Sequence, residues 1–357
     1  MTEACSKIDI FRNTRQTGKA MARKVIHLMG RLSELEIENF RCFKQRILKF
    51  ENPKGDASSL IVLAGPNGSG KTAILEAGLI AAGYDEPGFE KRGNGEIRIG
   101  AVLGRIKAKF QLQDRAAWVE ILFRADAKPV CEWESESGIF ASEKPFEIPC
   151  MYFSSWRSPR LIGALPITAG KRGRRPSNTE ENRLWNAKQY LVNARAHASM
   201  GVRLPEVLSK YDEIITRLNE TWSLFYRDRG QVFSVAPVSD DPESGFDVFL
   251  HNPDGRKVSV DLLSSGQLEV FTFSSSLLRS SFEAGIIFVD EPELHLDPQW
   301  HGVLLRAIRK LKPESQIIVA THSPLVFDSA RSYERHFLVP DEDPRVTTWG
   351  DVDSKAL

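Results

Sequence analysis

The sequence has few cysteines, no long apolar run and no excess of charge of either sign. Cys5, Cys42, Cys131 and Cys150 show no CxxC spacing, so we expect neither a disulfide framework nor a structural zinc site. No stretch approaches the ~18 consecutive apolar residues of a membrane span. The N-terminus is basic but has neither an apolar segment nor a cleavage site, which argues against a secretory signal. We therefore expect a cytoplasmic protein without a membrane partner.

The near balance of charge limits the classes of binding partner. The chain of 357 residues has 48 lysines and arginines against 47 acidic residues, a formal net charge of +1. A protein that is basic all over is thereby excluded, and any contact with nucleic acid must use a local patch. The remaining composition, with 41% hydrophobic and 27% charged residues, is that of an ordinary globular chain with one large core or two domains.

Two segments carry a local excess of basic residues. Residues 1–31 are predicted to be either a flexible leader or a basic arm for nucleic acid or a partner. Residues 156–177 contain no acid and are predicted either to bind the phosphates of double-stranded DNA or to form a solvated loop. The candidate nucleic-acid contacts are Arg157, Arg160, Lys171, Arg172, Arg174 and Arg175.

Hydrophobic patterns predict an α/β fold. Continuous apolar runs at 60–63, 286–289 and 316–320 are typical of strands buried on both faces. Since strands alternate with helical patterns, we expect a largely parallel sheet. The helices are expected at 71–82, 265–281 and 298–311.

Other segments alternate with the period of a half-buried strand. They predict a hairpin near the N-terminus and an antiparallel β subdomain after the first helix. The segments are 32–38, 46–50, 97–99, 108–110 and 118–123.

A pair of helices is predicted between the basic segment and the last third of the chain. The first begins at a cap near Ser177 or Asn178 and ends at Met200, with Gly201 just beyond it. The second has Pro205 in its first turn. Its apolar residues alternate in steps of four and three, which is typical of a coiled-coil seam. An antiparallel hairpin is predicted, and a helical subdomain packed on the core is the alternative that the sequence leaves open.

A glycine-rich loop follows the first buried strand. It has the pattern G-x-x-x-x-G-K-[ST], in which backbone N–H groups and the next helix N-terminus bind phosphate. Lys71 is predicted to reach the β- and γ-phosphates, and the Thr72 hydroxyl to bind Mg²⁺. The nucleotide-binding residues are Gly65, Pro66, Asn67, Gly68, Ser69, Gly70, Lys71 and Thr72.

Polar groups also follow the two later strands. Asp290 ends an apolar strand and is predicted to hold Mg²⁺, while Glu291 suits a general base for the attacking water. His322 follows the next strand and is predicted to sense the γ-phosphate. A small-residue loop before a helix is a second candidate phosphate cradle. Its residues are Leu263, Ser264, Ser265, Gly266 and Gln267.

These ordered motifs resemble the ATP-binding-cassette (ABC) ATPases over about residues 32–339, in particular the soluble SMC, RecF and OLD-type branch. GPNGSGKT at 65–72 resembles the Walker A motif, LSSGQ at 263–267 the signature, and IIFVDE at 286–291 the Walker B motif with its catalytic glutamate. Asp297 lies where the family has its D-loop, and His322 where it has its switch histidine. IENFRCF at 37–43 resembles the opening strand of this branch, which implies that Arg41 contacts ATP phosphate.

The resemblance implies a P-loop ATPase head of two lobes. Lobe I would span 32–155, the basic loop and helical insertion 156–230, lobe II 231–345 and a tail 346–357. The chain departs from the family in its signature, where Ser265 replaces a glycine, and in its Q-loop, for which Gln111 and Gln113 are candidates. The chain also has no room for the arms of an SMC protein or for the nuclease domain of OLD-type proteins.

The resemblance further implies ATP and Mg²⁺ as ligands and a homodimer, or a higher oligomer, with composite sites. The signature of one copy would cover the ATP held by Lys71, Thr72 and Arg41 of the other, and Glu291 would activate water. We expect an ATPase that senses DNA or gates a separate nuclease or toxin in bacterial anti-phage defence. A RecF-like DNA-repair ATPase, a scaffold with little turnover and a transporter subunit are the alternatives, of which the last fits the opening strand least.

Overall fold

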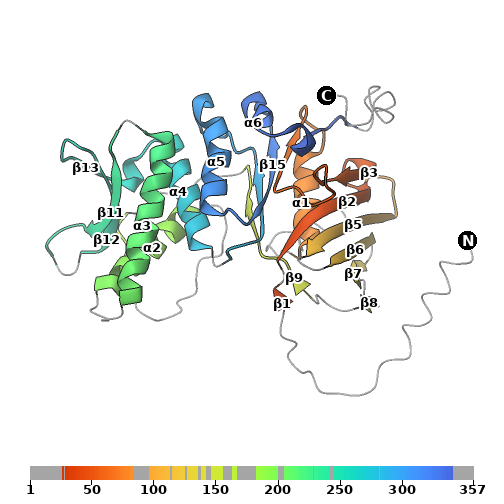
Figure 1. Cartoon of the computed structure of the whole chain (residues 1–357), viewed down its shortest axis with the longest axis horizontal. Helices are drawn as coiled ribbons and strands as arrows, with labels where there is room; N and C mark the ends of the chain where they lie inside the picture. Colours follow the sequence, from red (N-terminus) through yellow and green to blue (C-terminus); the bar gives the residue numbers. More distant parts are fainter. Residues whose placement is uncertain are drawn as a thin grey trace, which may run out of the picture.

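Five parallel strands form the central sheet of the protein, seen near the middle of Figure 1. The strands are β4 (Leu60–Ala64), β10 (Cys150–Phe153), β14 (Ile286–Asp290), β15 (Gln316–Thr321) and β16 (Arg335–Phe337). Their order in space is β10-β14-β15-β4-β16, and every neighbouring pair is parallel. The predicted parallel sheet is therefore confirmed, and the carboxyl ends of β4, β14 and β15 meet at one edge of it.

The structure is a computed structural model, which describes most of the chain between residues 26 and 340. The described ranges are 26–27, 29–83, 96–112, 115–124, 127–135, 138–141, 146–155, 163–166, 182–199, 205–227, 229–241, 244–280 and 282–340. The six predicted nucleic-acid contacts between Arg157 and Arg175 lie outside these ranges, as do most of the leader and the tail. Within them, no helix is long and apolar enough to cross a membrane.

An antiparallel sheet lies beside the parallel one, with strand order β3-β2-β5-β6-β7-β8. Its strands are β2 (Gly30–Phe40), β3 (Phe43–Lys49), β5 (Leu103–Leu112), β6 (Ala116–Arg124), β7 (Ala127–Ser135) and β8 (Gly138–Ala141). The predicted hairpin and β subdomain are confirmed. The strand predicted at 97–99 is wrong: Ile97 makes only an isolated bridge to Phe40, and Ile99 is fully exposed before a turn at Gly100, whose φ is +88°.

Strands β4, β10, β14 and β15 each contribute side chains to two hydrophobic cores, because successive side chains point to opposite faces. Ile61, Leu63 and Phe288 pack toward helix α1 (Lys71–Ala81), which lies between the two sheets. Val62 and Ile287 pack toward the helices on the other face. Burying each such side chain stabilises the fold by about 1.5–3 kcal/mol. The continuous apolar strands are thus explained by coverage on both sides.

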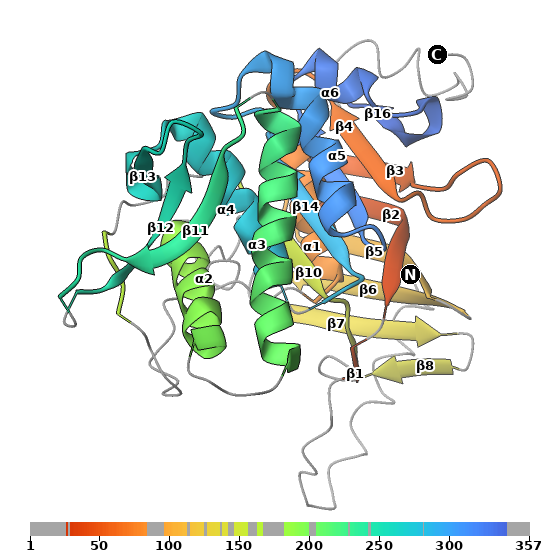
Figure 2. The same ribbon diagram turned by 60° about the vertical axis from the view of Figure 1, so that its left-hand side comes forward.

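Four helices lie on the other side of the parallel sheet, with α4 and α5 next to it and α2 and α3 further out (Figure 1 and Figure 2). They are α2 (Arg183–Ser199), α3 (Pro205–Phe225), α4 (Ser265–Arg279) and α5 (His301–Leu311). Helix α3 contacts α2, α4 and α5, and its Leu218 and Trp222 belong to the same core as the strands. Helices α2 and α3 contact each other, as the predicted hairpin requires, and they also pack on the core, so both features occur together in the structure.

The structure describes the first insertion helix from Arg183 onward, so its predicted cap stays a prediction. Helix α2 begins at Arg183, whereas the sequence pattern predicts a cap near Ser177 or Asn178, and these two residues lie outside the described part of the chain together with Gly201. A short 3₁₀ turn at Asn182 precedes the helix.

Smaller elements complete the described chain. A three-stranded antiparallel sheet with the order β11-β12-β13 lies beside α2 and α3 (Figure 1). A parallel pair of two-residue strands joins β1 to β9. The elements are β1 (Ile26–His27), β9 (Phe146–Glu147), β11 (Val232–Pro237), β12 (Phe246–His251), β13 (Lys257–Ser259), α6 (Pro324–Asp328) and 3₁₀ turns at Val260–Leu262, Pro298–Trp300 and Ser332–Glu334.

Candidate nucleotide site

The glycine-rich loop joins the end of β4 to the start of α1, as the motif predicts. Gly70 is the N-cap of α1 and adopts the left-handed conformation, with φ +86°. A Cβ at this position would collide with the ring of Phe43. Glycine is therefore required at this turn, both for its backbone conformation and for the close approach of β3. The helix has no side-chain N-cap, so its first N–H groups are left to a ligand or to solvent.

Lys71 is buried and folds back over the loop. Its Nζ donates to the carbonyl oxygens of Gly65 at 2.9 Å and of Pro66 at 3.1 Å. Burial lowers the pKa of Lys71, and the negative charges of Glu291, Asp290 and Glu293 partly offset that effect. The ammonium therefore lies within the field of the carboxylates at the sheet edge, and its present partners are two carbonyl oxygens that a phosphate oxygen can replace.

Thr72 and Asp290 are brought together as predicted. The Thr72 Oγ1 donates to Asp290 Oδ2 at 2.9 Å, and Asp290 is 1% exposed at the carboxyl end of β14. A hydroxyl and a carboxylate oxygen are the ligand types that Mg²⁺ prefers. The described residues contain no group of three or more His, Cys, Asp or Glu that could hold a metal ion. This donor pair thus fits an ion that takes its other ligands from phosphate and water.

Glu291 and His322 face each other across the edge of the sheet. His322 Nε2 lies 3.5 Å from Glu291 Oε1. Glu291 has a φ of +48°, and its N–H donates to the carbonyl of Ala320 at 2.8 Å. A non-glycine residue in this conformation is uncommon and is found at functional sites more than elsewhere. The backbone thus turns the Glu291 side chain at the point where β14 and β15 end side by side.

Glu293 is a site residue that the sequence analysis did not single out. Its carboxylate accepts hydrogen bonds from Thr321 Oγ1 at 2.8 Å and from the backbone N–H groups of His322 at 2.5 Å and Ser323 at 3.1 Å. These three bonds fix the loop that carries His322 against the loop that carries Glu291. The only signal in the sequence was the position of Glu293 two residues after Glu291, which fits a solvated turn equally well.

The signature residues form the N-terminus of α4. Ser264 is the N-cap and makes a capping box with Gln267, whose backbone N–H donates to Ser264 Oγ at 3.4 Å. Ser264 and Ser265 are exposed, whereas Gly266 is buried. A Cβ on Gly266 would lie 2.6 Å from the carbonyl oxygen of His295. The glycine thus lets this helix end approach the loop that follows Glu291.

Asp297, the predicted D-loop residue, lies on that same loop. Its side chain caps the 3₁₀ turn Pro298–Trp300 by accepting from the N–H of Gln299 at 3.0 Å.

Gln111, one candidate for the Q-loop glutamine, accepts a hydrogen bond from the N–H of Ala57. Gln113, the other candidate, lies outside the described residues. The assignment of the Q-loop stays open between them.

Arg41 lies behind the phosphate loop, at the turn between β2 and β3, with a φ of +50°. Its guanidinium binds the carboxylate of Glu96 through two hydrogen bonds of 2.8 and 3.1 Å, and forms an ion pair with Glu76 of α1. Both acids are buried. The sequence analysis identified the arginine but neither of its partners. Its contact with ATP phosphate stays a prediction.

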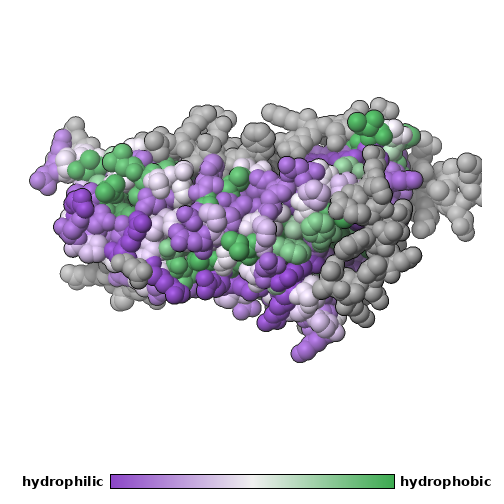
Figure 3. All heavy atoms as spheres, turned by 90° about the horizontal axis from the view of Figure 1, so that it is seen from above, coloured by the Kyte–Doolittle hydropathy of each residue, from purple (hydrophilic) through white to green (hydrophobic). Residues whose placement is uncertain are grey.

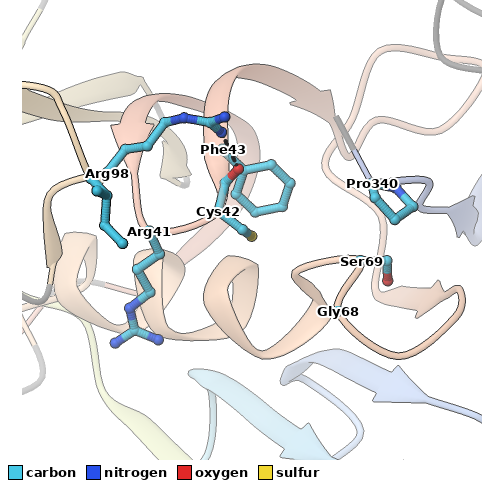
Figure 4. Close-up of a pocket in the computed structure, with 8 residues that line it drawn as sticks. Arg41, Cys42, Phe43, Gly68, Ser69, Arg98 and Pro340 are labelled. Atoms are coloured by element: carbon cyan, nitrogen blue, oxygen red, sulfur yellow. Dashed lines mark hydrogen bonds between the residues drawn. The ribbon is translucent and has the colours of Figure 1, made fainter. Parts of the chain in front are cut away.

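A pocket of 430 Å³ opens beside the phosphate loop (Figure 4). It is lined by residues of the β2–β3 turn, the loop after Glu96 and the phosphate loop itself. Arg98 crosses it and donates to the carbonyl of Cys42 at 2.5 Å, while Figure 4 shows the Arg41 side chain pointing away from that bond. The volume is within the range of small-molecule sites, about 300–1,000 Å³.

The fold and the site together define a P-loop ATPase with the architecture of an SMC head. The chain superposes on an Smc head bound to the C-terminal winged-helix domain of ScpA with a TM-score of 0.54, at 15% identity, over 84% of this chain and 92% of that one. A second Smc head, with an extended coiled coil and bound to the C-terminal domain of ScpA from Pyrococcus furiosus, gives a TM-score of 0.51 at 14% identity, over 85% and 92%. These likenesses establish the fold.

The family follows from the sequence match. Residues 60–328 match the family described as "AAA domain, putative AbiEii toxin, Type IV TA system", and residues 31–81 match the "AAA ATPase domain" family. Since the first match spans most of the chain, the protein belongs to this AAA-domain family and is an ATP-hydrolysing enzyme.

Three curated relatives share shorter or more distant similarity. The Septu protein PtuA of Bacillus thuringiensis is 42% identical over 62 residues, 17% of this chain and 16% of that protein. The "Retron Vc95 probable ATPase" of Vibrio cholerae is 30% identical over 91 residues, 25% and 18%. The Septu protein PtuA of Bacillus mycoides is 20% identical over 304 residues, 82% and 38%. The matched regions thus cover well under half of each relative.

Proposed function

We propose that this ATPase works as a head-to-tail pair whose ATP-dependent closure gates a separate effector in bacterial anti-phage defence. The observation that supports this most is the presence of two phosphate-binding halves in one chain. The loop around Lys71 is complete within the chain, whereas Ser264 and Ser265 are exposed at a capped helix N-terminus. Such a helix end attracts phosphate, and a second copy would supply it.

The surface supports an interface that needs nucleotide. Figure 3 views the molecule from above, the side on which α6 lies in Figure 1, and hydrophilic residues cover most of the described surface there. Hydrophobic residues form separate small patches on that face. Permanent dimer interfaces are more apolar than this. ATP held between the two copies would therefore supply the attraction, and its loss would let them part.

The phosphate half would bind ATP before the pair closes. Lys71 exchanges its two carbonyl partners for β- and γ-phosphate oxygens, and the first N–H groups of α1 donate to the same phosphates. Mg²⁺, when bound by Thr72 and Asp290, supplies positive charge that stabilises the phosphates. The neighbouring pocket, with Arg98 at its wall, would take the nucleoside.

Hydrolysis would then depend on Glu291 and His322. The Glu291 carboxylate orients and polarises the attacking water, and His322 lies within 3.5 Å of it, where it can bind the γ-phosphate and register its loss. Glu293 holds the loop of His322 in place through its three hydrogen bonds. Because phosphoryl transfer depends on positioning and charge, each of these groups acts by orientation or electrostatics.

The defence role is supported by the relatives rather than by the geometry. The family description refers to a toxin–antitoxin system; two of the three relatives carry the Septu name and the third a retron name. The effector, a nuclease or toxin, would be a separate protein. Double-stranded DNA, bound through the basic segment at 156–177, is the proposed trigger.

The experiment is ATP hydrolysis by the purified chain, with and without double-stranded DNA, alongside light scattering to measure mass. We expect turnover that DNA stimulates, and an ATP-dependent dimer that persists in Glu291→Gln but is absent in Lys71→Ala. Cells carrying the chain with its neighbouring genes should resist phage and lose resistance with Lys71→Ala. Turnover by a monomer would contradict the composite site, and DNA-independent turnover the proposed trigger. Sensitivity to DNA damage without any change in phage resistance would favour the repair function.

A further inference from the structure

A fully buried lysine lies beneath the signature loop. The Lys188 side chain of α2 is 0% exposed, and its Nζ contacts Asp247 Oδ1 at 2.7 Å, Asp261 Oδ2 at 2.7 Å and the carbonyl of Gly163 at 2.6 Å. Three directional partners thus satisfy the three donors of the ammonium. The second oxygen of Asp247 accepts from Ser259 Oγ at 2.6 Å, so the cluster also holds the end of β13.

The cluster holds the turn that leads directly into the signature. Asp261 is the middle residue of the 3₁₀ turn Val260–Leu262, and Ser264, the N-cap of α4, follows three positions later. The N–H of Leu263 donates to the carbonyl of Val260 at 3.2 Å, which keeps the turn continuous with the helix start. A shift of the Asp261 carboxylate would therefore move the exposed Ser264 and Ser265.

A second ion pair from the same helix lies on the other side of the signature. Arg183, in the first turn of α2, pairs with Glu269 of α4 at 3.8 Å, and both side chains are less than 10% exposed. Helix α2 thus contacts the chain just before the signature through Lys188 and just after it through Arg183. The signature is bracketed by two cations that one rigid helix carries.

The chemistry of the cluster favours positioning over simple stability. A buried ammonium loses its hydration, and apolar residues of similar volume often stabilise a core as well or better. Ionic hydrogen bonds, in contrast, fix direction and distance, as apolar contacts do not. None of the residues of the cluster lies among the groups assigned to ATP, so the catalytic machinery does not account for it.

We infer that Lys188 is a positioning residue for the signature: it holds the Val260–Leu262 turn so that Ser264 and Ser265 reach the nucleotide of a second copy. This inference rests on the proposed head-to-tail pairing. It assigns Lys188 no part in binding ATP within its own chain. Loss of the ammonium should leave the phosphate half intact and displace the signature half.

The test is ATP-dependent dimerisation of Lys188→Met in the Glu291→Gln background, together with binding of a fluorescent ATP analogue. The matched control is Lys312→Met. Lys312 is another buried lysine, and its Nζ donates to the carbonyls of Ser280 at 3.3 Å and Phe282 at 2.6 Å, just past the opposite end of α4. Both variants should lower the thermal midpoint, so measurements are made well below it.

We expect Lys188→Met to bind the analogue like its parent and to weaken ATP-dependent dimerisation by roughly 10- to 100-fold, the size of effect that a small misplacement produces. Lys312→Met should bind and dimerise normally. Equal weakening in both variants, or normal dimerisation of Lys188→Met, would overturn the positioning role. If the parent itself bound ATP without dimerising, the proposed function would fail instead, and a parent that did not bind ATP would overturn the site.

Discussion

The two phosphate-binding halves of the chain differ in how much of their machinery is internal. In the half around Lys71, side chains from different elements bind one another, as in the bond of 2.9 Å between Thr72 of α1 and Asp290 of β14. In the half around Ser264, this residue makes the hydrogen bonds of a capping box within one helix turn, and Ser264 and Ser265 are both exposed. The first half can be tested in one chain, whereas the second acquires its function only against another copy.

The ion pairs that hold each half in place also differ in how far they are buried. Behind the phosphate loop, Arg41 binds Glu96 and Glu76 at the rim of the pocket, and its side chain is 19% exposed. Beneath the signature, Lys188 is completely buried between Asp247 and Asp261. A partly exposed arginine can change partners when a ligand arrives, but a sealed lysine holds one arrangement. We therefore expect the phosphate half to rearrange when nucleotide binds and the signature half to keep its conformation.

The largest expected effect separates binding from turnover in the phosphate half. Lys71→Ala and Glu291→Gln should each lower ATP turnover by about 10²- to 10³-fold, as loss of one charge-stabilising group does. Only Lys71→Ala should also abolish binding of an ATP analogue, because Glu291 is assigned to the water and not to the phosphates. Steady-state turnover and equilibrium binding, measured on the same preparations, check this. Wild-type turnover in Glu291→Gln would show that another group is the base.

The second-largest effect is expected from a substitution in the signature half, Gly266→Ala. Gly266→Ala adds a Cβ that would lie 2.6 Å from the His295 carbonyl, so the helix end must move. We expect a loss of stability of about 1–3 kcal/mol, together with a loss of turnover and unchanged binding of ATP to the single chain. Denaturant unfolding and analogue binding measure the two quantities. If turnover survived the substitution, the signature would not need its present position.

Acid should lower the stability of the fold through a buried histidine next to β4, the strand that leads into the phosphate loop. His336 of β16 pairs with β4, its Nε2 is buried and has no hydrogen-bond partner among the described residues, and burial lowers its pKa to about 4. Since the unfolded state takes up the proton near pH 6.5, stability should fall as the pH drops from about 6.5 toward 4.

The residue as a whole is half-buried, so we expect a loss of about 1–2 kcal/mol between pH 7 and pH 5. His336→Leu should remove that part of the pH dependence. Unfolding curves of the two proteins at both pH values measure it, and equal losses in the two would show that other groups cause the acid sensitivity.

The smallest expected effect comes from Gly302→Ala, which is the control for Gly266→Ala. Gly302 lies in the first turn of α5, and a Cβ there would meet no atom within 4 Å. Gly302→Ala should therefore stabilise the protein by about 0.4–1 kcal/mol, since alanine restricts the unfolded chain without strain. Turnover should not change. Thermal unfolding measures the shift, and destabilisation would mean that this helix start needs its glycine.

Local patterns in the sequence were sufficient to predict which residues meet at the carboxyl edge of the parallel sheet. They were not sufficient to predict the charged residues that hold the site in place. Apolar runs located β4, β14 and β15, and parallel strands necessarily bring their carboxyl ends together, so Thr72 and Asp290 could be placed near each other. Glu293, Glu96 and Lys188 act through partners far away in the sequence. In the sequence such residues resemble the charged side chains of any solvent-exposed face, so only the tertiary structure identifies them.

The errors have the same origin. The alternation at 97–99 has the period of a strand, but Ile99 is fully exposed and pairs with no strand in the described part of the chain. The coiled-coil spacing of α3 was real, yet its apolar side chains pack against α2, α4 and α5 in the main core. Period alone gives the face that a helix buries and says nothing of what lies against that face.

The composite site is tested most directly by mixing two inactive variants. Lys71→Ala removes the phosphate half of its own chain, and Ser265→Arg blocks the exposed signature half without touching its own loop. Neither variant alone should hydrolyse ATP, but a mixture contains pairs in which the intact loop of one chain faces the intact signature of the other. We predict that turnover returns on mixing. A mixture as inactive as its components, or wild-type turnover by Ser265→Arg alone, would contradict the head-to-tail account.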